Sequence, residues 1–180
     1  MPMRLKSLLH TIAVGSLLAS YSPYVYAETY LTVDQAKVAL WQQQAMEYAP
    51  VTLTKDQMKS IAKASQTRVS NKKLKAWKVS DGGWFIVDQV VGKHEMIDIA
   101  VALTKDGKIK GLEVLQYRET YGDEIRHPKW LAQFLGRGTE EVLKLDKQIK
   151  NISGATLSCR HVTDGVNRWV HTWDQVLRYL

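Results

Sequence analysis

Residues 74–117 read LKAWKVSDGGWFIVDQVVGKHEMIDIAVALTKDGKIKGLEVLQY, and this stretch carries the strongest signal for the fold. β-branched and aromatic residues recur here in runs that we expect to be strands, over 74–79, 84–91, 96–103 and 109–117. Asp-Gly steps separate the first two runs and the last two, and glycine takes the positive φ that tight hairpin turns need. The stretch therefore predicts an antiparallel meander.

Two helices are predicted before the meander, on either side of Pro50. Thr32-Val33-Asp34-Gln35 and Thr54-Lys55-Asp56-Gln57 both fit the capping box, in which a threonine and a glutamine three residues later satisfy free N–H groups. Each helix has an apolar face that can pack on a sheet. The faces consist of Val33, Ala36, Leu40 and Trp41 in the first helix and Met58, Ile61 and Ala62 in the second.

After the meander we expect a short helix over about 128–134, a linker with Gly136 and Gly138, and a last helix from about Ser158 to Tyr179. An apolar stripe marks the core side of the last helix: Val162, Val166, Trp169, Val170, Trp173 and Leu177. The predicted fold class is α+β, a single domain whose antiparallel sheet has the N-terminal helices and the C-terminal helix packed on it.

Residues 1–27 have the pattern of a secretory signal peptide. Arg4 and Lys6 precede an apolar run, and Val25-Tyr26-Ala27 ends as a cleavage site does. The apolar run is well short of the ~20 residues that span a bilayer, so we expect cleavage, with a retained anchor as the alternative. The expected location is the periplasm.

Residues 28–180 have the size of one domain, which we divide into an N-terminal helical segment, 28–75, and a main segment, 76–180. The formal net charge of the full chain is +7, and two of its basic residues fall in the signal segment. This moderate charge does not indicate a nucleic-acid-binding protein. Cys159 is the one cysteine, so no internal disulfide can form, and we expect it to be buried.

The turn before the last helix carries the most specific chemistry, Ser153-Gly154-Ala155-Thr156-Leu157-Ser158. Gly154 and Ala155 let a backbone and a ligand approach closely, Thr156 and Ser158 offer hydroxyls, and the following helix offers free N–H groups. Such a turn can hold a phosphate. The alternative is an ordinary loop in which Ser158 caps the helix.

This turn resembles the flavin-attachment motif of the FMN-binding domain family, Asp-x-x-Ser/Thr-Gly-Ala-Thr, found in the flavin subunits of sodium-pumping NADH:quinone reductases and Rnf-type electron-transport complexes. Segments upstream are also similar to the family: 92–97, Asp106-Gly107, Glu119-Thr120 followed by Gly122, and 130–134. The similarity runs from about Trp77 to Val170. It implies that residues 76–180 are an FMN-binding domain.

The resemblance implies that Thr156 carries FMN through a phosphoester, which a separate flavin transferase makes from FAD. Arg160 and the start of the helix would then stabilise the phosphate charge. The expected cofactor-binding residues are Ser153, Gly154, Ala155, Thr156 and Leu157 in the turn, Glu119 and Thr120 on a loop that lines the flavin, and Trp130, which shields the ring or packs in the core. No metal site and no catalytic residue are expected.

Two positions depart from the family pattern. Lys150 stands where the motif has the acidic residue that the transferase reads, so covalent attachment and FMN binding without the bond both remain open. Tyr121 stands where the membrane-complex subunits have proline, which favours a soluble branch of the family.

The implied function is exported electron transfer, in which FMN relays electrons between membrane and periplasmic redox partners such as a membrane oxidoreductase or a cytochrome. Such a protein is a carrier or a subunit of an oxidoreductase system rather than a stand-alone enzyme. Lys55, Lys59 and Lys63 share a helix face, which is either simply solvated or a docking surface for an acidic redox partner.

Two other classes of function are also compatible with the sequence. One is a cofactor-free periplasmic binding or accessory module on the same scaffold. The other is a serine acyl enzyme, because Ser60 with Lys63 and Ser70 with Lys73 match a Ser-x-x-Lys pattern, although no Lys-Thr-Gly follows.

Overall fold

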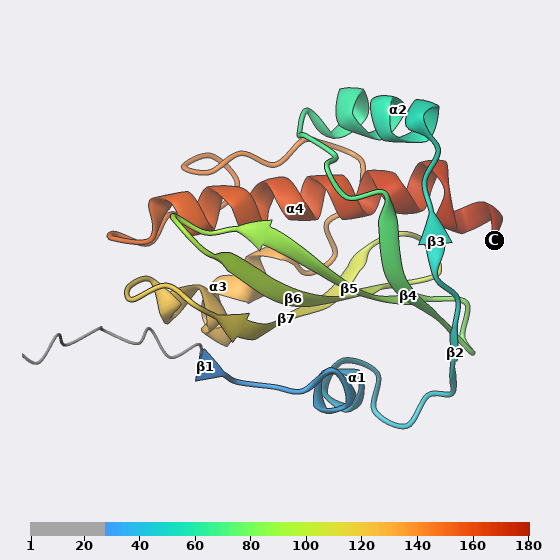
Figure 1. Cartoon of the computed structure of the whole chain (residues 1–180), viewed down its shortest axis with the longest axis horizontal. Coiled ribbons are helices and arrows are strands. Elements are labelled where there is room, and N and C mark those ends of the chain that lie inside the picture. Colours follow the sequence, from blue (N-terminus) through green and yellow to red (C-terminus); the bar gives the residue numbers. More distant parts are fainter. Residues whose placement is uncertain (1–27) are drawn as a thin grey trace, which may run out of the picture.

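The computed structural model describes residues 28–180 as a seven-stranded antiparallel sheet with helices on both faces (Figure 1). The strand order is β1-β7-β6-β5-β4-β2, and β3 also pairs with β4. The predicted α+β class is therefore confirmed. The predicted signal peptide, residues 1–27, lies outside the described residues.

The centre of the sheet is the predicted meander, which is confirmed. Its strands are β4 (Lys73–Val79), β5 (Trp84–Val91), β6 (Met96–Leu103) and β7 (Ile109–Tyr117). The turns contain Gly82 and Gly107 at φ +89° and +77°. At Gly107 the lack of a side chain also matters, because a Cβ there would collide with the ring of Trp173.

Three strands of the N-terminal segment were not predicted. β1 (Glu28–Thr29) pairs with β7, whereas β2 (Met46–Tyr48) and β3 (Val51–Thr52) pair with β4. Each is only two or three residues long, too short for a visible alternation of side chains. Through these strands, residues 28–75 join the same sheet as the rest of the chain.

The two N-terminal helices are α1 (Val33–Trp41) and α2 (Lys55–Ser65), and both predicted capping boxes are present. α1 packs on β6 and β7, as predicted. The second helix was predicted to pack on the sheet, and this is wrong, because α2 packs on α4 (Thr156–Gln175). The reason is that α4 already covers this face of the sheet, so α2 forms an outer layer (Figure 1).

The long helix α4 carries the predicted apolar stripe, with Val162, Val166, Trp169 and Val170 buried and Trp173 partly buried. One buried carboxylate also holds α4 to β5: Asp88 Oδ2 accepts hydrogen bonds from Trp169 Nε1 at 2.8 Å and from Arg168 Nη2 at 2.9 Å. A 3-10 turn, η3 (Leu177–Tyr179), follows α4. Cys159 is fully buried, as predicted, and burial raises the pKa of its thiol.

The connection from β7 to α4 begins with η1 (Asp123–Arg126), α3 (Pro128–Leu131) and η2 (Ala132–Phe134). The last two form the short helix that was predicted over 128–134. The chain then runs without a helix to the start of α4.

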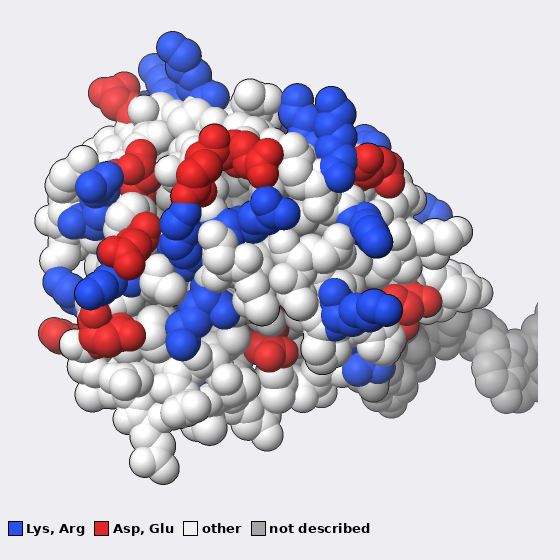
Figure 2. Space-filling view, turned by 180° about the vertical axis from the view of Figure 1, so that it is seen from behind, with Lys and Arg blue, Asp and Glu red and all other residues white. Residues whose placement is uncertain are grey.

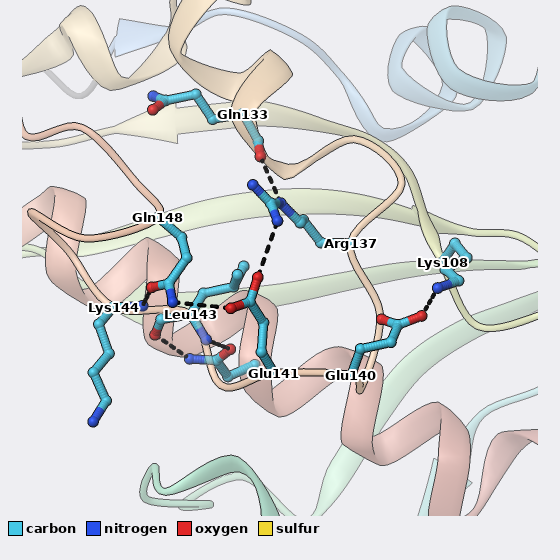
Figure 3. A network of polar contacts seen from close by, with 9 residues as sticks. Lys108, Gln133, Arg137, Glu140, Glu141, Leu143, Lys144 and Gln148 are labelled. Atoms are coloured by element: carbon cyan, nitrogen blue, oxygen red, sulfur yellow. Dashed lines mark hydrogen bonds and ion pairs between the residues drawn. The ribbon is translucent and has the colours of Figure 1, made fainter.

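Side chains hold this irregular segment in place (Figure 3). Glu141 accepts from Arg137 Nη1 at 3.1 Å and from Gln148 Nε2 at 2.9 Å, and Glu140 pairs with Lys108. Deeper in the fold, the amide of Asn167 on α4 both donates to and accepts from the backbone of Leu143, each at 2.9 Å. These bonds fix the approach of the chain to the turn at Ser153.

Charge is mixed over the side of the molecule opposite to that of Figure 1, where acidic and basic side chains are interspersed (Figure 2). This face therefore has no large field of a single sign. Within residues 28–180 no helix has both the length and the apolar character needed to cross a membrane.

Candidate functional site

A pocket of about 770 Å³ opens where the β5–β6 hairpin, the loop after β7 and the start of α4 meet. This volume lies within the range of small-molecule sites. Every residue predicted to bind the cofactor lines the pocket except Trp130. The full lining consists of Lys93, His94, Glu119, Thr120, Tyr121, Gly122, Asp123, Glu124, Ser153, Gly154, Ala155, Thr156, Leu157 and Ser158.

The helix start in this pocket is uncapped. α4 begins at Thr156, and its N-cap residue, Ala155, makes no side-chain capping hydrogen bond. The first turn of α4 also contains no acidic residue. Ser158, considered above as the cap, instead lies buried within the first turn. The free N–H groups and positive dipole end of α4 are therefore available to an anion.

A hydrogen bond from Asn151 fixes the hydroxyl of Thr156. Asn151 Nδ2 donates to Thr156 Oγ1 at 3.0 Å. The other amide atom, Asn151 Oδ1, is buried and has no hydrogen-bond partner among the described residues. Such an orphaned acceptor is uncommon, because buried polar groups are nearly always paired. Sequence reasoning missed Asn151, since the contact reaches across the whole turn.

Trp130 does not shield this pocket. Its ring is 6% exposed, meets Phe134 edge-on at 5.2 Å between centroids, and lines a separate hollow together with Lys150. Its indole Nε1 donates to the backbone carbonyl of Lys150 at 2.8 Å. Of the two roles considered for Trp130, packing in the core is the one that fits. Lys150 thus has a fixed backbone and an exposed side chain.

The small residues of the turn act differently from what the sequence indicated. Gly154 has φ +87°, and a Cβ on it would meet no protein atom within 4 Å, so the protein itself requires glycine here for its backbone conformation. Ala155 is only 4% exposed and packs against Gly122. A Cβ on Gly122 would lie 2.9 Å from that of Ala155, so this glycine lets the two walls of the pocket touch.

Glu119 joins the hairpin to the pocket. Its Oε1 accepts from the backbone N–H of His94 at 2.5 Å and of Glu95 at 2.9 Å. Burial raises the pKa of Glu119, but the backbone hydrogen bonds outweigh burial and bring the pKa below its ordinary value. The carboxylate therefore shapes the wall of the pocket, with one oxygen already engaged.

Tyr117 fixes the loop that follows it. Its hydroxyl donates to the backbone carbonyl of Tyr121 at 2.6 Å and lies 3.4 Å from Ser158 Oγ. Burial also raises the pKa of the Tyr117 phenol above its ordinary value. One residue of the sheet thereby contacts both walls of the pocket.

Two basic residues, Lys93 and His94, line the pocket and were not predicted as site residues. Arg160 was considered as a partner for phosphate, but it is exposed and is not among the lining residues. His161 instead secures the hairpin, since its Nδ1 lies 2.7 Å from the carbonyl oxygen of Val91.

Residues 92–171 match the sequence profile of the FMN-binding domain family. This segment is an FMN-binding domain. All the lining residues of the pocket lie within the match. No curated protein matches the chain. The cofactor of the FMN-binding domain is FMN, so the pocket has to suit a phosphoryl group and a flat ring system.

The pocket fits FMN in two respects. The uncapped start of α4 provides free N–H donors beside the Thr156 hydroxyl, as a phosphoryl group requires. The lining also includes large side chains with exposed apolar surface, Tyr121 and Leu157, which suit a flat ring. The FMN-binding domain thus offers a polar and an apolar region in one pocket.

The two Ser-x-x-Lys pairs do not lie in a pocket of this kind. Ser60 and Ser70 are exposed, as are Lys63 and Lys73. Among residues 28–180 no cluster of His, Cys, Asp or Glu could hold a metal ion.

Proposed function

We propose that this chain is an electron-transfer flavoprotein whose FMN is attached through a phosphoester to Thr156. The observation that carries the proposal is the position of Thr156 as the first residue of an uncapped helix, with Oγ1 3.0 Å from Asn151 Nδ2, inside the pocket of the FMN-binding domain. A threonine so placed presents its hydroxyl where the helix favours negative charge.

Attachment at Thr156 suits the local electrostatics. A phosphodiester keeps one negative charge, which the free N–H groups at the start of α4 stabilise. The hydrogen bond from Asn151 fixes the Thr156 hydroxyl against the wall of the pocket. The backbone of Lys150 is fixed by Trp130 and by Gln133, whose Oε1 accepts from the Lys150 N–H at 2.8 Å. A transferase matched to this chain would then meet an exposed lysine on a rigid backbone.

FMN accepts electrons in pairs and releases them singly, and the protein positions the cofactor for this exchange. We propose that the chain is exported to the periplasm, loses residues 1–27, receives FMN from a flavin transferase, and passes electrons between a membrane oxidoreductase and a soluble carrier. The soluble branch of the family, indicated by Tyr121, accords with this role.

Intact-mass measurement tests the attachment. The chain is produced with and without a flavin transferase, as wild type, Thr156→Ala and Thr139→Ala, the last being an exposed threonine outside the pocket. We expect an FMN adduct with the transferase in the wild type and in Thr139→Ala, and none in Thr156→Ala. An adduct that survives Thr156→Ala would disprove the assignment.

Absorbance of the protein after incubation with FMN, followed by dialysis to remove unbound flavin, distinguishes reversible binding from covalent attachment. Flavin that is retained without a mass adduct means that the domain binds FMN reversibly, as the lysine at position 150 allows. A colourless protein that gains no flavin absorbance would instead favour the cofactor-free accessory module.

A further inference from the structure

Tyr121 combines a fixed backbone with a free ring. Its carbonyl accepts the 2.6 Å hydrogen bond from Tyr117, and the next residue, Gly122, packs on Ala155. The ring, however, is 82% exposed, the largest fraction among the exposed large hydrophobic side chains of residues 28–180. Within those residues Tyr121 takes part in none of the ring–ring or cation–ring contacts of the fold.

Leu157 is a second exposed apolar side chain at the same pocket. It is 41% exposed and comes from the first turn of α4, whereas Tyr121 comes from the loop after β7. Two large apolar side chains on different walls of one pocket are suited to a flat apolar ligand, whose binding would remove both from water. Because the loop of Tyr121 is already fixed, only side-chain torsions need ordering.

We infer that Tyr121 stacks on the flavin ring of FMN, with Leu157 supporting the ring from the start of α4. The inference rests on the proposed function only in that FMN occupies this pocket, and it does not require the bond to Thr156. Aromatic rings prefer offset stacking or edge contacts, and a tyrosine on a rigid loop provides a large contact area at small entropic cost.

The test uses the Thr156→Ala chain as parent, because without the bond FMN affinity is a reversible equilibrium. FMN is titrated into this parent and into the same chain with Tyr121→Ala, Tyr121→Phe or Tyr179→Ala. Tyr179 is a matched control, 75% exposed on η3 after the far end of α4. Flavin emission and the dissociation constant are both measured. Far-UV circular dichroism checks that each variant folds, which we expect because Tyr121 is barely packed.

We expect Tyr121→Ala to weaken FMN binding about tenfold, the size of a ring-stacking contact. Tyr121→Phe should retain most of the affinity, because the ring is kept. Emission of bound FMN should be low in the parent, since a stacked phenol quenches excited flavin by electron donation, and it should rise in both Tyr121 variants. Tyr179→Ala should match the parent in both readouts.

The outcomes separate this inference from the proposed function. If the parent binds FMN and Tyr121→Ala matches it in affinity and emission, the stacking role is wrong while the FMN pocket stands. If neither the parent nor the wild type binds FMN, both fail. If only the parent fails to bind, the covalently loaded wild type and its Tyr121→Ala variant decide the question by emission alone, and equal emission overturns the stacking role.

Discussion

The N-terminal helices and the last helix begin in opposite ways. Thr32 and Thr54 accept from the N–H of Gln35 and Gln57 at 3.2 and 3.1 Å, and each of these helices has an aspartate in its first turn. α4 has neither a side-chain cap nor an acidic residue in its first turn. The capped helices each satisfy two free N–H groups with their own side chains, and the uncapped one begins in the pocket that we propose holds FMN. A missing cap on a long helix can therefore mark the place where a ligand supplies the anion.

The strongest test of this contrast gives α4 a carboxylate of its own. Leu157→Glu places a negative charge in the first turn, where at ~5 Å and an effective dielectric constant of about 20 it repels a phosphate by roughly 3 kcal/mol. FMN affinity in the Thr156→Ala parent should fall about a hundredfold. The free protein should gain about 0.5 kcal/mol of stability from the helix dipole.

Leu157→Gln is the control for the lost leucine, because it has the same size as glutamate and no charge. Titrations of both variants compare the two effects. Equal losses of affinity in the Gln and Glu variants would show that charge at the start of α4 does not matter for FMN.

Gly154→Ala tests the backbone of the turn itself. Gly154 at φ +87° and Gly136 at φ +74° both have open space where a methyl group would lie, so alanine at either position brings strain without a clash. Each substitution should lower the free energy of unfolding by about 1–2 kcal/mol in urea. Only Gly154→Ala should also weaken FMN binding, because Gly136 lies outside the pocket. A similar affinity loss for both would point to general destabilisation.

Removing a cap should affect stability alone. Thr54→Ala breaks the capping box of α2 and should cost about 1 kcal/mol of unfolding free energy, with FMN affinity unchanged. Thr156→Ser keeps a hydroxyl that can accept from Asn151 Nδ2, so it should leave the stability of the free protein nearly unchanged. Urea denaturation of the two variants beside the wild type decides, and the contrast fails if Thr156→Ser costs as much as Thr54→Ala.

The weakest effect that we expect is the pH dependence from Glu119. Its pKa in the folded protein lies below the value of ~4.3 for an unfolded chain, so its contribution to stability is complete above that pH and is lost as pH falls through the folded pKa. Urea midpoints of wild type and Glu119→Gln should therefore converge below about pH 4. Curves that stay parallel from pH 7 to pH 3 would contradict the hydrogen-bonded carboxylate.

The sequence predicted those helices and strands whose own residues show a clear periodic pattern. The strands 84–91, 96–103 and 109–117 have the predicted bounds because alternation and Asp-Gly turns define them within a few residues. The strands β1, β2 and β3 have no such internal pattern and exist only through their pairing with β7 and β4. The packing of α2 on α4 depends on which helix occupies the sheet, which its own apolar face does not reveal.

The sequence motifs indicated residues that lie together in the pocket, among them Glu119, Thr120 and Thr156. Contacts between distant segments were missed. Tyr117 reads as an ordinary strand residue, yet its hydroxyl contacts both walls of the pocket. Trp130 was assigned to either of two roles, because its sequence position does not show whether its ring turns inward or outward. Its burial, its edge contact with Phe134 and the 2.8 Å bond to Lys150 show that it packs in the core.

The strand pairing of β1 determines at which end of the domain the preceding chain is attached. Glu28 lies opposite Tyr117 in the sheet, and the hydroxyl of that tyrosine holds the loop of the pocket. The chain preceding Glu28 therefore joins the domain at the flavin end. Under the proposed export to the periplasm, cleavage after residue 27 would therefore release the chain at the end of the domain where the pocket lies.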